Sequence, residues 1–266
     1  MSKAIEEGFQ VATKLLLGKE LTNIDGYAVW LKRHVPFPVA EKSMVSNEKV
    51  YYIGKDDYNR DCLKVWWNTF AKLHGNLITL KEAEEHKNLK ISDEDLNDLS
   101  LSNAKEKIKK IKFISRDARI EPSIDLEDVV YYAEAMHCSH GIYYTYSKYC
   151  SYCCFPRKSE YAYGSWTLLN SKFCINCYES SKLTRCFEVA ESTNCQDCYF
   201  CYNSENLDNC MFCSNATSKR YAIGNVEIGK EKYTELKNKI LESINEELEK
   251  KKDLKWDIYN IGCYDG

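Results

Sequence analysis

The sequence predicts an α+β fold in which a helical N-terminal domain precedes a Cys-rich β-solenoid with 12-residue repeats, followed by a C-terminal capping helix. Three observations lead to this prediction. Twelve of the 14 cysteines lie between Cys138 and Cys213, and eleven of those twelve have numbers divisible by three. Small residues in the same stretch recur at every twelfth position, which is typical of a repeat architecture. The flanking segments have helical periodicity and contain only Cys62 and Cys263.

The repeat is clearest in one column of residues, each taken from the same position of successive units. The members of this column are all small: Cys138, Cys150, Ala162, Cys174, Cys186, Cys198, Cys210 and Ala222. Such a unit is too short for a strand and a helix, so we interpret each unit as one coil of a solenoid. Neighbouring coils then pair as parallel strands about 4.8 Å apart. The spacing also fits a wider coil made from two successive units, and both geometries stay open at this point.

The interior of such a coil is narrow and accepts mainly Cys, Ser and Ala, so large side chains are expected to point outward. Asparagine recurs at one position of the repeat, at Asn170, Asn194 and Asn206. This column predicts a corner, because Asn tolerates the left-handed backbone conformation of a turn. Four outward aromatic residues predict either a flat binding face or packing against a cap or a neighbouring subunit: Tyr199, Phe200, Tyr202 and Phe212.

Residues 1–113 are predicted to form the helical domain. A first helix is expected to end at Gly18, and a strand is expected at Val50-Tyr51-Tyr52-Ile53. A second apolar stripe at helical spacing runs from Tyr58 to Leu73. Residues that favour a helix N-terminus predict three further short helices, which begin after Thr79, Ser92 and Ser102.

Residues 114–228 are assigned to the solenoid and residues 229–266 to a C-terminal amphipathic helix and tail. The repeat stops at Gly229, and Lys230–Asp253 then has apolar residues on one helical face. A solenoid end exposes unpaired strand edges, so the flanking helices are expected to cover them. The alternative is that the C-terminal helix docks a partner.

Two Cys-x-x-Cys pairs on adjacent coils offer four thiols to one metal ion: Cys198, Cys201, Cys210 and Cys213. Paired Cys-x-x-Cys is a common pattern of zinc sites, because thiolates are soft ligands and the gap lets both reach one ion. The three-residue phase of the repeat produces the same spacing without a metal, and buried Cys packs as a small hydrophobic residue. We therefore expect no cofactor and reduced thiols in the core, with zinc or an iron–sulfur cluster at these four cysteines as the alternative.

The segment His137-Cys138-Ser139-His140, followed by Cys150 and Cys153, resembles a second metal constellation. In the frame of the repeat, however, the two histidines fall in outward columns, whereas the cysteines point inward. Because metal ligands must share one centre, we do not expect these residues to converge.

The chain lacks the phosphate loop, the dinucleotide-binding glycine motif, the nucleophile elbow and the zinc-protease helix motif, so we do not expect an enzyme. A β-helix can host sugar chemistry that uses two carboxylates. The candidates for that alternative lie on nearby coils: Glu179, Glu188, Glu191 and Asp197.

The coil length resembles that of insect-type antifreeze solenoids, but the Thr-x-Thr rows that bind ice are missing. The stretch from Cys174-Ile175-Asn176-Cys177-Tyr178 to Tyr221-Ala222-Ile223-Gly224-Asn225 is similar to Cys-rich repeat proteins of microbes and their viruses. The resemblance covers about the last half of the chain and implies a β-solenoid, but no established activity.

We therefore predict a non-catalytic structural or protein-interaction solenoid, a subunit of a larger intracellular or viral assembly, with a protein partner or a second copy of itself. Apolar runs are too short to span a membrane, and the net charge of −3 gives no signal for nucleic acid. No apolar signal segment follows Met1, which predicts a cytoplasmic protein or one assembled in a particle inside the cell.

Overall fold

The computed structural model describes residues 3–35, 38–53, 76–115, 119–120, 122–153, 162–165, 172, 174–176, 178, 185–190 and 196–263. Contacts group Met1–Phe37 with Ile120–Gly266 in one compact unit and Pro38–Arg119 in a second. The predicted stripe from Tyr58 to Leu73 lies outside the described residues. This grouping differs from the predicted boundary at residue 113, because the first helix packs on the solenoid.

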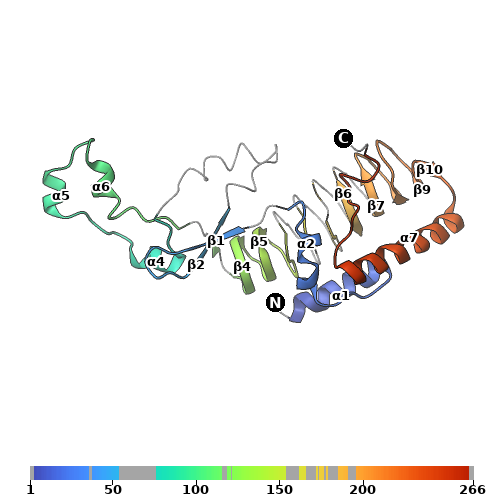
Figure 1. The fold of residues 1–266 in the computed structure, drawn as a ribbon, viewed down its shortest axis with the longest axis horizontal. Helices are drawn as coiled ribbons and strands as arrows, with labels where there is room; N and C mark the ends of the chain where they lie inside the picture. The colour runs from blue at the N-terminus through green and yellow to red at the C-terminus, as the bar shows by residue number, and fades with distance from the viewer. Residues whose placement is uncertain are drawn as a thin grey trace. The chain divides into compact units, whose positions relative to one another are not determined.

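The helices and strands follow one another along the chain as α1 (Lys3–Leu17), η1 (Ile24–Tyr27), α2 (Ala28–Leu31), β1 (Pro38–Lys42), β2 (Lys49–Ile53), α4 (Leu80–Glu85), α5 (Asp93–Asn97), α6 (Ala104–Ile108), β3 (Arg119–Ile120), β4 (Ile124–Ala133), β5 (Met136–Thr145), β6 (Cys186–Ala190), β7 (Gln196–Tyr202), β8 (Asp208–Met211), β9 (Arg220–Ile223), β10 (Val226–Glu227) and α7 (Lys230–Lys251). Figure 1 shows the strands from β4 to β9 stacked as successive coils. None of the helices among the described residues combines the length and the apolar character that crossing a lipid bilayer requires.

The register of the strands confirms the solenoid. Every parallel pair that the structure describes from β4 to β9 joins equivalent positions of successive units, as in Leu126 opposite Cys138 and Cys198 opposite Cys210. Isolated bridges such as Ser139 to Ser151 continue the same offset between β5 and β6. One coil therefore corresponds to one repeat unit, and the wider coil made from two units is wrong.

The fully described coils turn at four corners each, with left-handed backbone. From Asp197 to Tyr221 every third residue has a positive φ, between 43° and 55°. The predicted Asn corner is confirmed at Asn206 (φ 53°), whereas Asn170 and Asn194 lie outside the described residues. Left-handed φ costs L-residues about 1 kcal/mol each. Hydrogen bonds between coils offset this cost, since corner N–H groups donate to carbonyls of the preceding coil, as from Phe212 to Tyr199 at 3.0 Å.

The interior of the solenoid is filled by the residue that follows each corner. The predicted column of small residues is buried along its whole described length, from Cys138 to Ala222. Tyr144 is a large exception, and it is fully buried. It fits because Gly141, in the neighbouring inward column, has no side chain: a Cβ there would lie closer than 3.0 Å to the Tyr144 hydroxyl.

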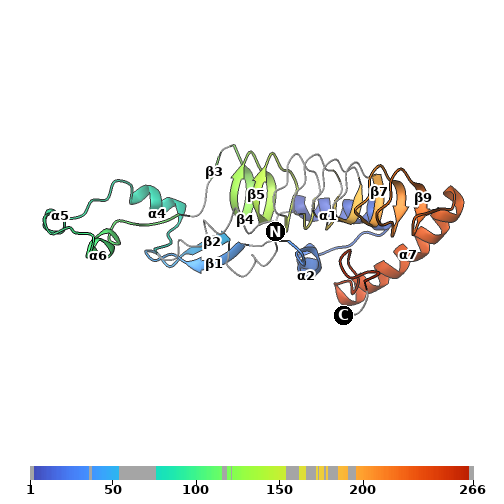
Figure 2. The same cartoon turned by 90° about the horizontal axis from the view of Figure 1, so that it is seen from above.

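One outward column forms a second core with the helices. This outer apolar column consists of Tyr163, Ile175, Phe187, Tyr199 and Met211, all of which are buried. Helix α1 follows it along the stack, because the Tyr163 hydroxyl donates to Ile5 O at 3.4 Å and the Tyr199 hydroxyl donates to Leu16 O at 2.9 Å. Figures 1 and 2 show α1 lying along the coils. Of the alternatives predicted for the outward aromatic residues, Tyr199 and Phe200 follow the second: both pack in a core with the chain's own helices.

The C-terminal helix packs on the same side. Strand β10 turns back antiparallel on β9 and covers the edge of the last coil. In the first turn of helix α7, Tyr233 packs against Tyr221, with ring centroids 5.8 Å apart. Further along the helix, Asn245 Nδ2 donates to Leu17 O at 2.9 Å. Helix α7 thus joins the end of the solenoid to the end of α1.

In the second unit, β1 and β2 form an antiparallel hairpin, which confirms the predicted strand. The capping box at Thr79 and Glu82 and the N-cap at Ser92 are confirmed. The N-cap at Ser102 is wrong, because α6 is preceded by Asn103, whose side chain instead accepts from Ser100 N at 2.8 Å.

Candidate functional site

The four cysteines predicted as metal ligands all lie in the dry interior. Cys198, Cys201, Cys210 and Cys213 are each fully buried. Their thiols already have acceptors, because each donates to a backbone carbonyl two residues earlier, as from Cys198 Sγ to Gln196 O at 3.2 Å. Several also reach the next coil, as from Cys210 Sγ to Lys219 O at 3.5 Å.

Two inward serines make the same bond. Ser147 and Ser204 donate to the carbonyls two residues earlier at 3.0 and 2.8 Å. The carbonyl of the residue before such a corner points into the coil, and a short side chain with one donor satisfies it. This explains why Cys and Ser share the inward columns.

The thiols of the C-terminal coils also contact one another. Hydrogen bonding to Cys213 and burial both raise the pKa of Cys210. Hydrogen bonds from the Cys201 and Cys210 thiols outweigh burial at Cys213 and lower its pKa to about 3. Of these two buried thiols, Cys213 is therefore the one that ionises more readily.

No three His, Cys, Asp or Glu side chains in the described parts of the chain are arranged to hold a metal ion. Cys177, which belongs to the same inward column as Cys201 and Cys213, lies outside those parts. The zinc assignment at the four cysteines stays a prediction.

The two histidines of the second constellation point away from the cysteines, as the frame predicted. His137 Nδ1 lies 2.8 Å from Asp125 Oδ2 one coil earlier, and its ring stacks on Tyr149 one coil later, with centroids 5.1 Å apart. His140 pairs in the same way with Asp128 at 3.4 Å. Cys138, Cys150 and Cys153 are buried inside, so the histidines and the cysteines occupy opposite sides of the coil wall.

Of the four candidate catalytic carboxylates, Glu179 and Glu191 lie outside the described residues. Glu188 is fully buried and Asp197 is half-buried, and the two occupy different corners of the coil. Glu188 stacks on Asn176, whose Nδ2 lies 3.5 Å from Glu188 Oε1. The sequence did not single out this pair, because the same column of the repeat also holds polar residues at Asp128 and His140.

A polar cluster that the sequence did not predict covers Glu188. It joins the end of α2 to the segment after α7, here called the C-terminal strap (residues 253–263). His34 Nε2 lies 2.9 Å from Asp257 Oδ2, and Arg33 pairs with both Asp253 and Asp257. Asp257 is only 3% exposed. These residues are more than 200 positions apart, so no local pattern could reveal the cluster.

Two apolar cavities lie beside the strap. One, of about 720 Å³, is lined by Tyr202, Ser214, Tyr259 and Cys263 among others. The second, of about 530 Å³, is lined by α7 residues such as Ile240 and Ile244 and by Trp256. Both cavities share Phe200, Phe212 and the strap residue Ile261, so they adjoin each other at these three side chains.

Comparison with known protein families, curated proteins and solved structures yields no match to this chain. Function is therefore inferred from the geometry of the chain itself.

Proposed function

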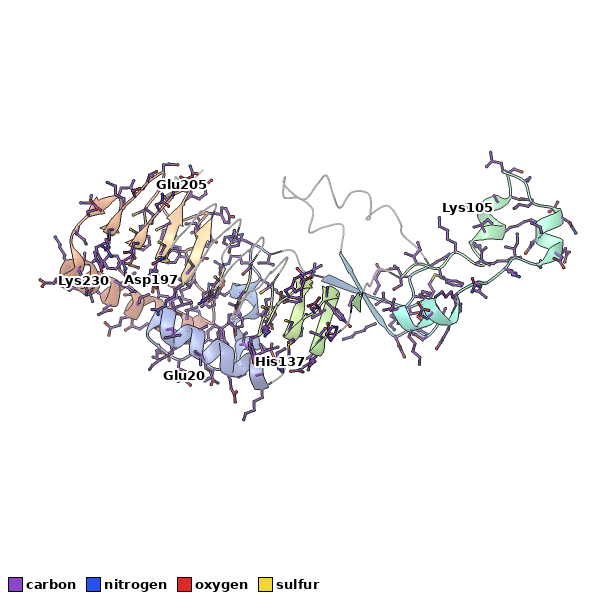
Figure 3. All side chains as sticks on the ribbon, turned by 180° about the vertical axis from the view of Figure 1, so that it is seen from behind. Glu20, Lys105, His137, Asp197, Glu205 and Lys230 are labelled. Carbon is purple, nitrogen blue, oxygen red and sulfur yellow. The ribbon has the colours of Figure 1, made fainter. Side chains whose placement is uncertain are left out.

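We propose that the chain is a non-catalytic interaction protein that binds a protein partner, or a second copy of itself, along the faces of the solenoid that its own helices leave uncovered. Among the described residues, α1, α2, α7 and the strap pack mainly on the outer apolar column and on the corners to either side of it. Figure 3 shows Glu205 on the side of the coils away from α1 and α7.

The observation that carries this proposal is that exposed side chains pair with their equivalents on the adjacent coil. Asn203 Nδ2 donates to Asn215 Oδ1 at 2.7 Å, and Arg220 Nε donates to Asp208 Oδ2 at 2.8 Å. Each hydrogen-bonded pair joins equivalent positions of adjacent coils and fixes polar groups at the coil spacing of about 4.8 Å. A surface ordered in advance loses little conformational entropy when a partner binds, which suits an interaction role.

A photo-crosslinking residue at Glu205 or Thr217 tests the proposal. Both positions are exposed and pair across adjacent coils. We expect one recurrent crosslinked species, either another protein or a second copy, and a matching native mass. The same residue at Lys250 on α7 is the control and should give no such species.

The double variant Asn203→Lys, Asn215→Lys should remove the crosslink, because it places like charges opposite each other on adjacent coils of that face. Lys250→Glu should leave it unchanged. A monomeric native mass together with no crosslink from either solenoid position would contradict the interaction role.

Zinc or iron–sulfur binding at Cys198, Cys201, Cys210 and Cys213 is the second candidate, and the lowered pKa of Cys213 favours it. We nevertheless expect less than one equivalent of zinc or iron per chain by elemental analysis, because each thiol proton already binds a carbonyl. Cys210→Ser should then lower stability by only about 1–2 kcal/mol, since Ser fits the inward columns elsewhere. One or more bound equivalents, lost in that variant, would establish the metal site.

A further inference from the structure

The C-terminal strap crosses the corner column at the point where Asn176 and Glu188 stack. The Ile258 N–H of the strap faces the Glu188 carboxyl, and Asp257 is close enough for its charge to act on Glu188. On the other side, Asn176 Nδ2 donates to Trp30 O at 3.4 Å. Glu188 therefore lies where the solenoid, α2 and the strap meet.

Two oxygens in this junction have no hydrogen-bond partner among the described residues. They are Glu188 Oε2 and Asn176 Oδ1, and both are buried. With an ionised carboxylate, two acceptors would be left without a proton in a dry site, which is costly. A protonated carboxyl would supply the missing donor: an Oε2–H directed at Oδ1, beside the Nδ2–Oε1 contact of 3.5 Å, would close a cyclic acid–amide pair.

We propose that Glu188 is a neutral carboxylic acid while the strap is docked, and that ionisation of Glu188 releases the strap. The acid–amide pair satisfies both oxygens without a net charge. Ionisation breaks that pair and places a second negative charge beside Asp257, which anchors the strap.

The charged and titratable groups that face Glu188 come from two elements. The strap contributes Asp257 and also Asp253, which pairs with Arg33. The segment after α2 contributes Arg33 and His34. Burial raises the pKa of Glu188 well above its usual value, the Asp257 charge adds to the rise, and Arg33 opposes it. At Asp257, burial alone would raise the pKa, but hydrogen bonds from His34 and the Tyr259 N–H and the Arg33 charge lower it.

The two shifts act on docking at opposite ends of the pH scale. The pKa of Glu188 is raised when the strap is docked. The contribution of neutral Glu188 to docking is therefore complete below its ordinary pKa near 4.5, and it is lost as pH rises through the pKa of the docked state. Because the docked pKa of Asp257 is lowered, its contribution is present above its ordinary value and is lost as pH falls through the docked one. The strap is therefore held most tightly in mildly acidic solution.

Release of the strap would change the surface as well as the charge. Ile261 lies on the strap and lines both cavities, of about 720 and 530 Å³. When it leaves, both become one apolar groove along the stacked rings of Phe200 and Phe212, whose centroids are 5.5 Å apart.

Hydrogen exchange of residues 253–263 in the full chain tests the proposal, with wild type and Glu188→Gln compared at each pH so that intrinsic exchange rates cancel. Gln keeps both hydrogen bonds to Asn176 but cannot ionise. We expect equal protection at about pH 5 and at least tenfold lower protection of the wild-type strap at about pH 9. Asp197→Asn, an amide substitution at another corner, should follow the wild type.

Equal protection of the wild-type and Glu188→Gln straps throughout this range would overturn the proposal. Infrared spectroscopy gives a second readout that does not depend on docking. The docked wild type should show the absorption of one protonated carboxylic acid near neutral pH. Pairing of Glu188 with Asn176 predicts that Asn176→Asp or Glu188→Gln shifts or removes this absorption. Its absence in the wild type would also overturn the proposal, even if the variants fold poorly.

Discussion

Alanine at position 141 is expected to destabilise the solenoid by about 3 kcal/mol or more, a large effect for a single added methyl group. The new Cβ would lie closer than 3.0 Å to both the Tyr144 hydroxyl and the Cys153 carbonyl. Neither can yield easily. The Tyr144 hydroxyl donates to Ser139 O at 2.9 Å and accepts from Cys153 N at 3.2 Å, and the Cys153 carbonyl is backbone of the next coil.

Equilibrium unfolding in urea measures this loss, with Gly26→Ala as the matched control. A Cβ at Gly26 meets only the flexible side chain of Asn23, at 3.3 Å, so the control should cost far less. Adding Tyr144→Phe to Gly141→Ala should restore only part of the stability, because the Cys153 carbonyl still blocks the Cβ. A Gly141→Ala protein as stable as the control would contradict the packing described for the first coils.

Alanine at position 164 is expected to detach α2 from the solenoid. Its Cβ would collide with the Leu31 carbonyl, and the backbone there has a φ of 79°, which disfavours any residue with a side chain. Leu31 and Trp30 are buried in the outer core, so their separation from the coil should cost about 3 kcal/mol or more.

The backbone part of this effect is isolated by Gly224→Ala. Gly224 also has a positive φ, 57°, but a Cβ there meets nothing within 4 Å, so the control should lose only about 1 kcal/mol. Hydrogen exchange over residues 24–35 should rise in Gly164→Ala and stay unchanged in Gly224→Ala. Equal stability of the two variants would show that Leu31 does not approach the coil at Gly164.

The sequence was sufficient to predict the coil because the period of the small residues is itself the packing rule. Cys198 and Cys210 occupy the same position of successive units and lie directly opposite each other in the sheet, so counting gives the register. Local capping was also predictable at Thr79, because its reciprocal bonds with Glu82 are formed within a single helical turn.

Other features depend on contacts that the spacing of residues along the chain does not reveal. A hydrophobic pattern does not report φ, so of the corners that the structure describes between Asp197 and Tyr221 the sequence indicated only the one at Asn206. The packing of α1 along the outer apolar column needs two segments that are far apart in the chain. The fit of Tyr144 beside Gly141 left only a partial trace, since Gly141 replaces the Cys153 and Ser165 of the following units, whereas the column of Tyr144 also holds Tyr132 and Pro156.

At the candidate site, sequence reasoning identified Glu188 and the thiols by residue type but not by surroundings. Glu188 looked like a surface carboxylate because its column faces outward. It is buried because Asp253 and Asp257, near the end of the chain, return to Arg33 and His34 over that corner. Only the tertiary structure brings these charges together.

The length of helix α1 matches the height of the coils along which it packs. Its Ile5 and Leu16 carbonyls accept from Tyr163 and Tyr199, and the helix rises about 16 Å from the first carbonyl to the second. The tyrosines are three coils apart, or about 14 Å at the spacing of parallel strands. Inserting or deleting one coil between them would therefore require α1 to change in length by nearly one helical turn. The lengths of the two elements are expected to vary together in any chain of this design.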